Sequence, residues 1–417
     1  MKQLRQFLFA CLIFAILFAY AMFQGGKVSW FMFFSFLPIF IYVVCLKLYP
    51  ISKWQVERKL QKRIIRAGDD ILLVIRIKRS IPFPLFSLVC EAVFPNTLKR
   101  IDNGLTKYTT FDSGQHLYIE RESKKIIFPW FKRVIEIPFQ LHQVPRGEHI
   151  LQKVKVRTSD LFGFIKKEHT FHLKDYIQVY PNERKITMDE QISSFEHGPI
   201  SSSVLHARQA NIVSGTREYI PGDRLSWVDW KQTARKNKIM TKEFEQEKST
   251  DTLIVLDSSS HQNMSEIPYE GSVEIVMSLV GLLQRQGTNV GLLSIGKDAG
   301  RVSLKPDPNK YEKIRNLLMR IQPSNNRNFS VQLKEEITKT NGQFAIIIVT
   351  TRMDAAFKQV LTELRRKTRK ITVLIIMAAK KITPKDYEMI QELQFANVDI
   401  QVLTEKEMKQ QWLEVTG

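Results

Sequence analysis

The pattern of hydrophobic and polar residues divides the chain into three regions. The first holds two uncharged apolar runs, residues 7–23 and 28–46, with the polar turn Gln24-Gly25-Gly26-Lys27 between them. At about 1.5 Å of rise per residue, each run is long enough to cross the hydrocarbon core of a bilayer. The pattern predicts a transmembrane helical hairpin within residues 1–50. A cleaved signal peptide is disfavoured, because no small-residue cleavage site lies before the second run.

The second region, residues 51–181, alternates between apolar and polar positions with a period of two, which is typical of strands. The expected strands are 71–78, 87–94, 116–121, 133–141, 154–158, 169–173 and 177–181. Strands at this spacing, broken by Pro, Gly and Asn, predict a β-sandwich domain. Phe162 and Phe164 follow a turn at Asp160, and we expect them to plug the end of the sandwich.

The third region, residues 251–417, combines continuous apolar strands with segments of helical period. The expected strands are 252–257, 289–296, 343–351, 371–377 and 398–404, and the expected helices are 270–286, 309–321, 331–339, 354–368, 384–394 and 405–414. Buried strands that alternate with helices predict a doubly wound, parallel α/β sheet. Residues 182–250 show little periodicity and are interpreted as a linker that carries a charged segment at 215–235.

The segment 215–235 concentrates paired charges and aromatic side chains. Its candidate functional residues are Arg217, Tyr219, Pro221, Gly222, Asp223, Asp229, Trp230 and Arg235. Pro221-Gly222 fits the centre of a type II turn, after which we expect Asp223 to cap a short helix. Two interpretations stay open: a hydrogen-bonded network that fixes an irregular loop, or a partner-binding site anchored by Trp, Tyr and Arg. An acid–base pair of Asp223 and Asp229 is the enzymatic alternative, although nothing in the sequence supplies a nucleophile.

Charge adds information about topology and partners. The chain has 62 Lys and Arg against 42 Asp and Glu, a formal charge of +20. A cluster of basic residues from Lys47 to Arg66 follows the second apolar run. The positive-inside rule then predicts that both termini are cytoplasmic. This basic run should also contact anionic lipid. Nucleic acid is an alternative partner, but no known nucleic-acid module is present, so we do not expect it.

The first strand of the third region ends in Asp257-Ser258-Ser259-Ser260-His261, at the edge where parallel sheets bind ligands. No phosphate loop, zinc-protease motif or serine-hydrolase motif is present, so no catalytic residue is assigned and we expect a non-enzyme. The run resembles the metal motif of von Willebrand factor A domains, Asp-x-Ser-x-Ser with a Thr and an Asp from later loops. Asp257 and Ser259 match, His261 stands at the third position, and Asp354 is the candidate later Asp. The resemblance implies a degraded site, for which Mg²⁺ is the candidate cofactor.

Residues 215–235 also resemble the signature of the bacterial "domain of unknown function 58" family. The matching runs are Arg-Glu-Tyr-x-Pro-Gly-Asp at 217–223 and Asp-Trp…Ala-Arg at 229–235, and Arg146-Gly147 and Asp160-x-Phe162-Gly163 are similar too. The resemblance implies a membrane-anchored adaptor or scaffold whose A-type domain mediates protein–protein interaction. It also implies two partners, a MoxR-type AAA+ ATPase and a transglutaminase-like membrane protein, in protein assembly, maturation or envelope stress. A metal- or carboxylate-dependent enzyme is the alternative function.

Overall fold

The structure, a computed structural model, describes most of the chain in two compact units. The described residues are 2–109, 111, 118–188, 212–245, 251–260, 265–296, 300–324, 328–339, 344–366, 368 and 370–415. The first unit comprises residues 1–182, 265–267 and 315–322, and the second comprises 183–264, 268–314 and 323–417. His261 and residues 116–117 lie outside the described residues, and the rest of the predicted strand 116–121 forms only an isolated bridge at Tyr118.

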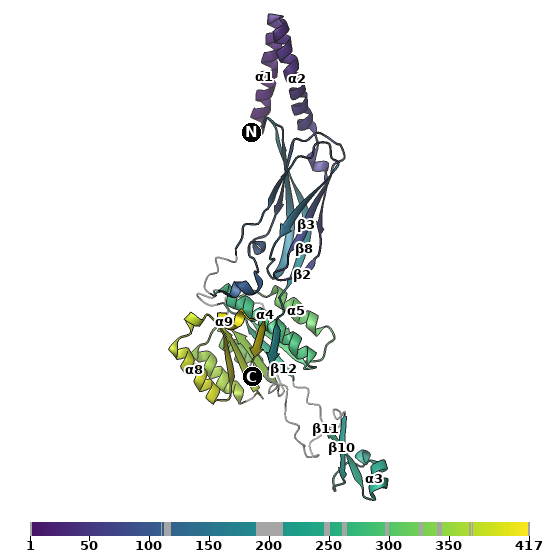
Figure 1. Cartoon of the computed structure of the whole chain (residues 1–417), viewed down its shortest axis with the longest axis vertical. Helices are drawn as coiled ribbons and strands as arrows, with labels where there is room; N and C mark the ends of the chain where they lie inside the picture. The colour runs from purple at the N-terminus through teal and green to yellow at the C-terminus, as the bar shows by residue number, and fades with distance from the viewer. Residues whose placement is uncertain are drawn as a thin grey trace. The chain divides into compact units, whose positions relative to one another are not determined.

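The first unit begins with a helical hairpin, α1 (Lys2–Gln24) and α2 (Lys27–Leu48), which runs antiparallel (Figure 1). Gly25, with φ of 63°, supplies the left-handed residue of the turn. The two helices pack through aromatic rings, and Phe14 stacks on Phe40 with 4.1 Å between ring centroids. Both helices are long and apolar enough to cross a membrane. The predicted helices are therefore confirmed, while their insertion into a bilayer stays a prediction.

Eight strands of the described residues form two sheets in the first unit. The smaller sheet has the order β1-β3-β6, from β1 (Gln55–Leu60), β3 (Ile71–Lys78) and β6 (Val134–Leu141). The larger has the order β2-β8-β7-β4-β5, from β2 (Ile64–Arg66), β4 (Ser87–Val93), β5 (Lys124–Ile127), β7 (Gly147–Ser159) and β8 (Lys166–Tyr180). All pairs except the parallel β2–β8 are antiparallel.

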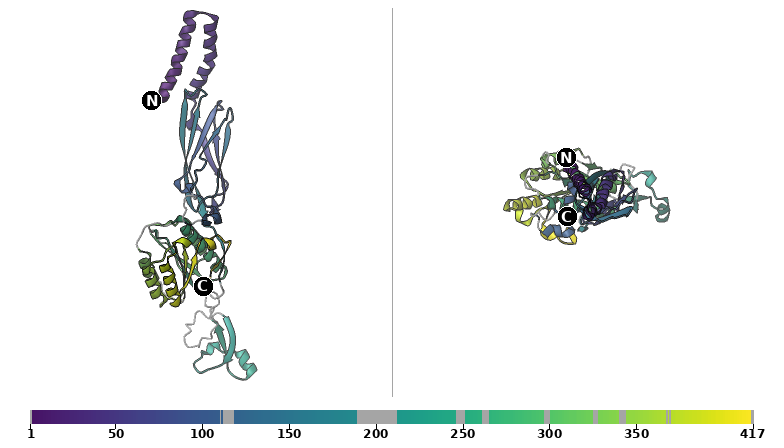
Figure 2. Two further views of the ribbon diagram at one scale, coloured as in Figure 1. Left: turned by 60° about the vertical axis from the view of Figure 1, so that its left-hand side comes forward. Right: turned by 90° about the horizontal axis from the view of Figure 1, so that it is seen from above.

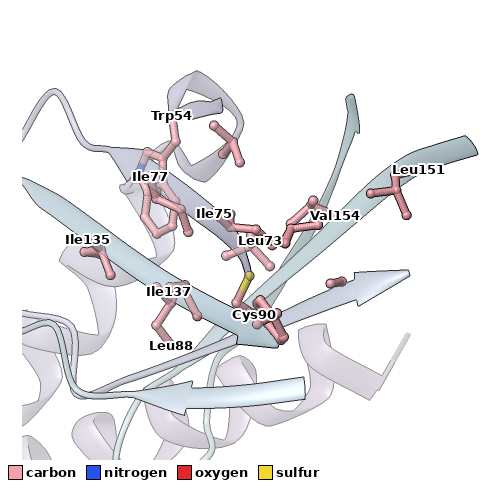
Figure 3. Packing of buried hydrophobic residues seen from close by; sticks show 14 of the residues in the cluster. Trp54, Leu73, Ile75, Ile77, Leu88, Cys90, Ile135, Ile137, Leu151 and Val154 are labelled. Atoms are coloured by element: carbon pink, nitrogen blue, oxygen red, sulfur yellow. The ribbon is translucent and has the colours of Figure 1, made fainter. Parts of the chain in front are cut away.

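The alternation in the sequence explains the core of this unit. Every second residue of β3 and β6 is buried, because successive side chains of a strand point to opposite faces. The buried side chains of both sheets enter one apolar cluster, in which Leu73 and Ile137 of the smaller sheet face Cys90 and Val154 of the larger (Figure 3). Burial raises the pKa of the Cys90 thiol to about 12. The cluster thus joins the two sheets into one hydrophobic core.

The strand prediction differs from the structure at polar interruptions. The predicted strands 169–173 and 177–181 form the single strand β8, which ends at Tyr180 and pairs with β7 through a bulge between Leu151 and Lys153. The short strands β1, β2 and β5 were missed. Their patterns are too short or too charged to stand out, and pairing with longer neighbours defines them.

The second unit contains a sheet of the order β14-β13-β12-β15-β16-β17 among its described residues (Figures 1 and 2). The strands are β12 (Thr252–Asp257), β13 (Val290–Ile295), β14 (Arg301–Val302), β15 (Ala345–Thr350), β16 (Lys370–Ile376) and β17 (Asp399–Leu403). The helices are α4 (Glu266–Arg285), α5 (Lys310–Arg320), α6 (Phe329–Thr338), α7 (Ala355–Arg365), α8 (Pro384–Phe395) and α9 (Glu405–Met408). Only β14 runs antiparallel to its neighbour, so the prediction of a parallel α/β sheet is confirmed.

The C-terminal end of the chain differs from its prediction. The expected helix 405–414 ends at Met408, and the chain continues as strand β18 (Trp412–Val415). This strand pairs in parallel with β9 (Lys185–Met188), from the stretch interpreted as a linker. Such a short strand is stable only with a partner distant in sequence, and that partner cannot be read from local pattern.

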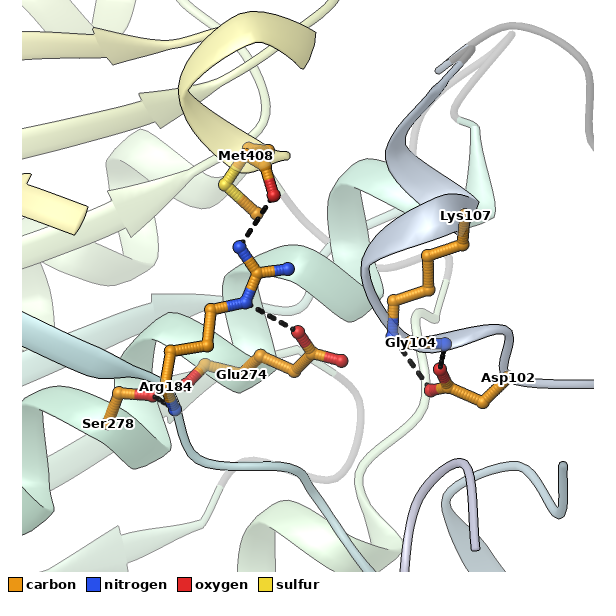
Figure 4. A network of polar contacts seen from close by, with 7 residues as sticks. All are labelled: Asp102, Gly104, Lys107, Arg184, Glu274, Ser278 and Met408. Carbon is orange, nitrogen blue, oxygen red and sulfur yellow. Dashed lines mark hydrogen bonds and ion pairs between the residues drawn. The ribbon is translucent and has the colours of Figure 1, made fainter. Parts of the chain in front are cut away.

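A buried polar network fixes the entry of the chain into the second unit (Figure 4). The Arg184 guanidinium lies 3.2 Å from the Glu274 carboxylate of α4 and donates to the Met408 carbonyl oxygen of α9 at 2.7 Å. The Arg184 backbone N–H donates to the Ser278 hydroxyl. Residues next to Arg184 therefore belong to the α/β unit and not to a free linker.

Candidate functional site

Residues 212–245, which we call the signature module, form a small fold inside the second unit. Strands β10 (Ile212–Glu218) and β11 (Met240–Glu245) pair antiparallel, and helix α3 (Trp230–Lys236) lies between them in sequence. The turn after Pro221 places Gly222 at φ of 112°, as the predicted type II turn requires. The module therefore has regular structure across the predicted charged segment.

Asp223 and Asp229 both act as structural acceptors in the signature module. Arg217 Nη2 donates to Asp223 Oδ1 at 2.7 Å, and the Ile220 N–H donates to the other carboxylate oxygen. Asp229 accepts from the backbone N–H groups of Lys231 and Gln232 and is the N-cap of α3. The prediction that Asp223 caps the helix is thus wrong, because its carboxylate closes the turn that precedes it. Both carboxylates are therefore engaged by hydrogen bonds within the module.

The exposed surface of the signature module is apolar and cationic. Trp230 is 70% exposed and Leu225 73%, and Ile220 and Ile239 are also exposed. The exposed cations are Arg224, Lys231, Arg235, Lys236 and Lys238, of which Lys238 pairs with Glu218. The acidic residues of 215–235 are all engaged, since Glu218 pairs with Lys238 while the two aspartates make the bonds described above. Tyr219 contributes through its backbone, whose N–H donates to the Ile239 carbonyl oxygen.

A second polar cluster lies where the sheet of the second unit reverses its strand order. Strand β12 pairs with β13 on one side and β15 on the other, and crevices at such a point bind ligands in parallel sheets. Asp257 ends β12, and Thr350 ends β15. The fold brings these two residues together, because the carboxyl ends of parallel neighbours share one edge.

Asp257 is buried, and both of its carboxylate oxygens have partners. Ser259 donates to Oδ1 from its backbone N–H at 3.0 Å and from its hydroxyl at 2.5 Å. Thr350 donates to Oδ2 at 2.8 Å, and Arg352 Nε lies 3.5 Å from the same oxygen. Burial raises the pKa of Asp257, while the bonds from Ser259 and Thr350 and the charge of Arg352 oppose the rise. We call these four residues the switch-point cluster.

In the switch-point cluster, protein donors occupy both carboxylate oxygens of Asp257. Asp354, the predicted later ligand, caps α7 by accepting from the Phe357 N–H at 2.7 Å. The described residues contain no group of three His, Cys, Asp or Glu that could hold a metal ion. A hard cation needs about six oxygen ligands. Here the guanidinium of Arg352 already supplies a positive charge beside Asp257.

Sequence reasoning found Asp257 and Ser259 but missed Thr350 and Arg352. The signal was present, because Thr350 lies at the end of the predicted apolar strand 343–351. The same edge argument that singled out Asp257 applies to it. Arg352 could not have been assigned to the cluster from the sequence, since basic residues often follow strands. The direction of the Arg352 side chain depends on the conformation of its loop.

Comparisons with known proteins give a family and a relative. The model of the family described as "Protein of unknown function DUF58" matches residues 215–405, which include the signature module and most of the α/β sheet. The chain is 35% identical over 287 residues to "Uncharacterized protein YeaD" of Bacillus subtilis (strain 168), covering 69% of this chain and 67% of that protein.

Solved structures give weaker similarities. The PilB minor pilin from Streptococcus sanguinis matches with 7% identity and a TM-score of 0.28, over 78% of this chain and 85% of that one. The CARDB domain of the PF1109 protein from Pyrococcus furiosus matches with 10% identity and a TM-score of 0.18, over 30% of this chain and 92% of that one. Scores this low carry no structural argument. The match to the family model and the extent of the match to the Bacillus protein show that this chain belongs to the DUF58 family.

Proposed function

We propose that this protein is a non-catalytic, membrane-anchored adaptor whose signature module binds a partner protein. The hairpin α1–α2 anchors it with both termini in the cytoplasm, and the two sheets of the first unit act as a β-sandwich. The second unit is a von Willebrand factor A-like domain. The observation that carries the proposal is the exposed Trp230 on helix α3, which also carries the exposed cations Lys231, Arg235 and Lys236. A large aromatic side chain at 70% exposure is a typical anchor for an interface.

The chemistry of this surface favours an acidic partner. Lys231, Arg235 and Lys236 are exposed on or beside α3, while nearby carboxylates are engaged in the module. Complementary charge increases the association rate, and the apolar anchors supply affinity. From the family resemblance we propose a MoxR-type AAA+ ATPase as this partner and a transglutaminase-like membrane protein as a second one.

Trp230 gives the direct test of partner binding. We expect Trp230→Ala to weaken binding of the ATPase to the full-length protein by about thirty-fold, or about 2 kcal/mol, the loss of an interface anchor. The fold should persist, because this side chain is largely exposed. Binding is measured by biolayer interferometry with the protein in nanodiscs.

The matched control is Trp412→Ala, which removes an exposed Trp outside the signature module. It should leave the affinity unchanged. Equal affinity of the wild type and Trp230→Ala would refute the assignment of the module as the binding surface. Absence of ATPase binding by the wild type, combined with no photo-crosslink from position 230 to any acidic partner in cells, would remove the adaptor proposal itself.

We further propose that the switch-point cluster binds no metal, because the Arg352 guanidinium occupies the position beside Asp257 that a cation would take. Arg352→Ala should then create a weak Mn²⁺ site, because it leaves the Asp257 carboxylate beside two hydroxyls without its positive neighbour. Calorimetric titration of the full chain with Mn²⁺ should show heat for this variant and none for the wild type. Asp257→Ala/Arg352→Ala is the control and should lose the gained heat. Equal Mn²⁺ binding by the wild type and Arg352→Ala would contradict this role of Arg352.

A further inference from the structure

Three loops of the first unit gather at the end of the sheets that receives α2. The strand register places them together, since Lys78 pairs with Val134 and Ser87 pairs with Ser159. Leu85 and Trp130 also exchange backbone hydrogen bonds between two of the loops. We call these segments the end loops, and they are residues 79–86, 128–133 and 160–165.

Contacts with Tyr42 and Tyr49 show how far the end loops reach along the axis of α2. The Tyr49 hydroxyl donates to the Ile81 carbonyl oxygen at 2.7 Å, and the Tyr42 hydroxyl donates to that of Pro84 at 3.1 Å. Tyr42 lies six residues before Leu48, the end of α2, which is about 9 Å along the helix axis. Loop 79–86 therefore overlaps the last turns of a helix long enough to span a bilayer. If α2 spans the membrane, this loop lies at the level of the headgroups.

The end loops are held in a fixed conformation. The buried side chain of Arg79 donates to the carbonyl oxygens of Phe83, Trp130 and Lys132. Trp130 adopts φ of 46°, which is strained for a bulky residue and persists only where its surroundings impose it. The buried carboxylate of Asp160 accepts three backbone N–H bonds in its own loop. These side-chain bonds to backbone carbonyl and N–H groups hold the loops in place.

The fixed end loops present apolar side chains to the outside. Phe162, which was expected to plug the sandwich, is 57% exposed, and only Phe164 packs partly on the core. The exposed apolar residues of the end loops are Ile81, Phe86, Phe128, Trp130, Phe131, Leu161 and Phe162. Contiguous exposed apolar side chains mark an interaction surface, and aromatic residues are enriched where proteins meet the membrane interface.

The charge of this end complements anionic lipid. Asp160 is the one acidic residue of the end loops, and it is buried. Lys132, Arg133 and Lys166 are exposed at or next to the loops, and Lys53 is exposed just after α2. Each such cation near an anionic surface contributes about 1 kcal/mol of attraction.

We propose that the end loops form a membrane-docking surface that inserts its aromatic side chains into the bilayer interface beside α2. The inference rests on the proposed membrane anchor. It adds that the first unit is seated on the lipid by its own loops, rather than suspended from the hairpin alone. Continuity with α2, the outward aromatic residues and the absence of exposed acids in the loops all point to lipid as the occupant.

Site-directed spin labelling of the full chain in nanodiscs that contain anionic lipid tests this. Nitroxides are placed through Phe131→Cys and Phe162→Cys, in a background with Cys11→Ser and Cys45→Ser. Cys90 is retained, because burial and a thiol pKa of about 12 keep it unreactive. The control is Leu72→Cys, an exposed position near the opposite end of the same sheets. A separate protein that keeps only Cys11 and Cys90 reports on insertion of α1.

We expect labels at positions 131 and 162 to collide several-fold more with oxygen, and several-fold less with a water-soluble nickel chelate, than the label at position 72. A label at 11 in lipid with labels at 131 and 162 in water would overturn this inference and leave the anchor standing. A label at 11 in water would overturn both. Protection of positions 131 and 162 from oxygen as well as nickel would indicate coverage by a second copy of the chain, and would also overturn the inference.

Discussion

Replacing Glu274 with Ala is expected to lower the free energy of unfolding of the second unit by about 3–5 kcal/mol, the usual loss when one partner of a buried ion pair is removed. The side chains of Arg184 and Glu274 are only 4% and 5% exposed, and their charged atoms lie 3.2 Å apart (Figure 4). Without Glu274, the buried Arg184 guanidinium loses the carboxylate that lies 3.2 Å from it. The variant should therefore loosen the segment that leads into β9.

Hydrogen exchange of the β12 and β15 amides in the full chain measures this change, because these central strands exchange only when the unit unfolds. Glu363→Ala is the matched control in the same unit. It breaks the exposed Lys334–Glu363 pair and should cost less than about 1 kcal/mol. Arg184→Met/Glu274→Leu should recover part of the loss, since it removes both charges. Equal losses of unfolding free energy in Glu274→Ala and Glu363→Ala would show that the buried pair stabilises the unit no more than an exposed pair does.

The first unit is expected to lose about 3 kcal/mol of stability as the pH falls from 6.5 to about 4, because of His149. Burial lowers the pKa of His149 from 6.5 to about 4. Its Nε2 donates to the Pro145 carbonyl oxygen, so the neutral ring accepts from Thr97 at Nδ1. Between these pH values the unfolded chain binds a proton that the folded chain does not, so acid favours unfolding. The difference of about 2.5 pKa units corresponds to about 3 kcal/mol at 1.36 kcal/mol per unit.

Hydrogen exchange of β7 and β8, corrected for the intrinsic pH dependence of exchange, follows this loss. His149→Gln should be less stable than the wild type at pH 7 but should show a flatter dependence between pH 6.5 and 4. His172→Gln, which changes an exposed residue of β8, should retain the full slope. A slope in His149→Gln as steep as in the wild type would assign the acid sensitivity to other groups.

Much of the fold follows from local pattern. The uncharged runs 7–23 and 28–46 predicted α1 and α2, because continuous apolar runs of that length favour helices. The predicted strand 71–78 coincides with β3, and 252–257 coincides with β12, because alternation or a continuous apolar run dictates which faces are buried. Pattern failed where stability comes from a distant partner, as in the pairing of β9 with β18. It also failed where a polar interruption masks a long strand, as in β8.

The candidate sites divide in the same way. The sequence by itself determined that 215–235 is a distinctive segment and that Asp257 and Ser259 stand at a strand end, because residue type and strand ends are local properties. Only the tertiary structure decided what these residues do. It turned Asp223 toward Arg217, made Asp229 the helix cap, and set Arg352 beside Asp257. It also turned Phe162 outward. The direction of a side chain depends on neighbours brought together by packing, and that information is not contained in any short stretch of sequence.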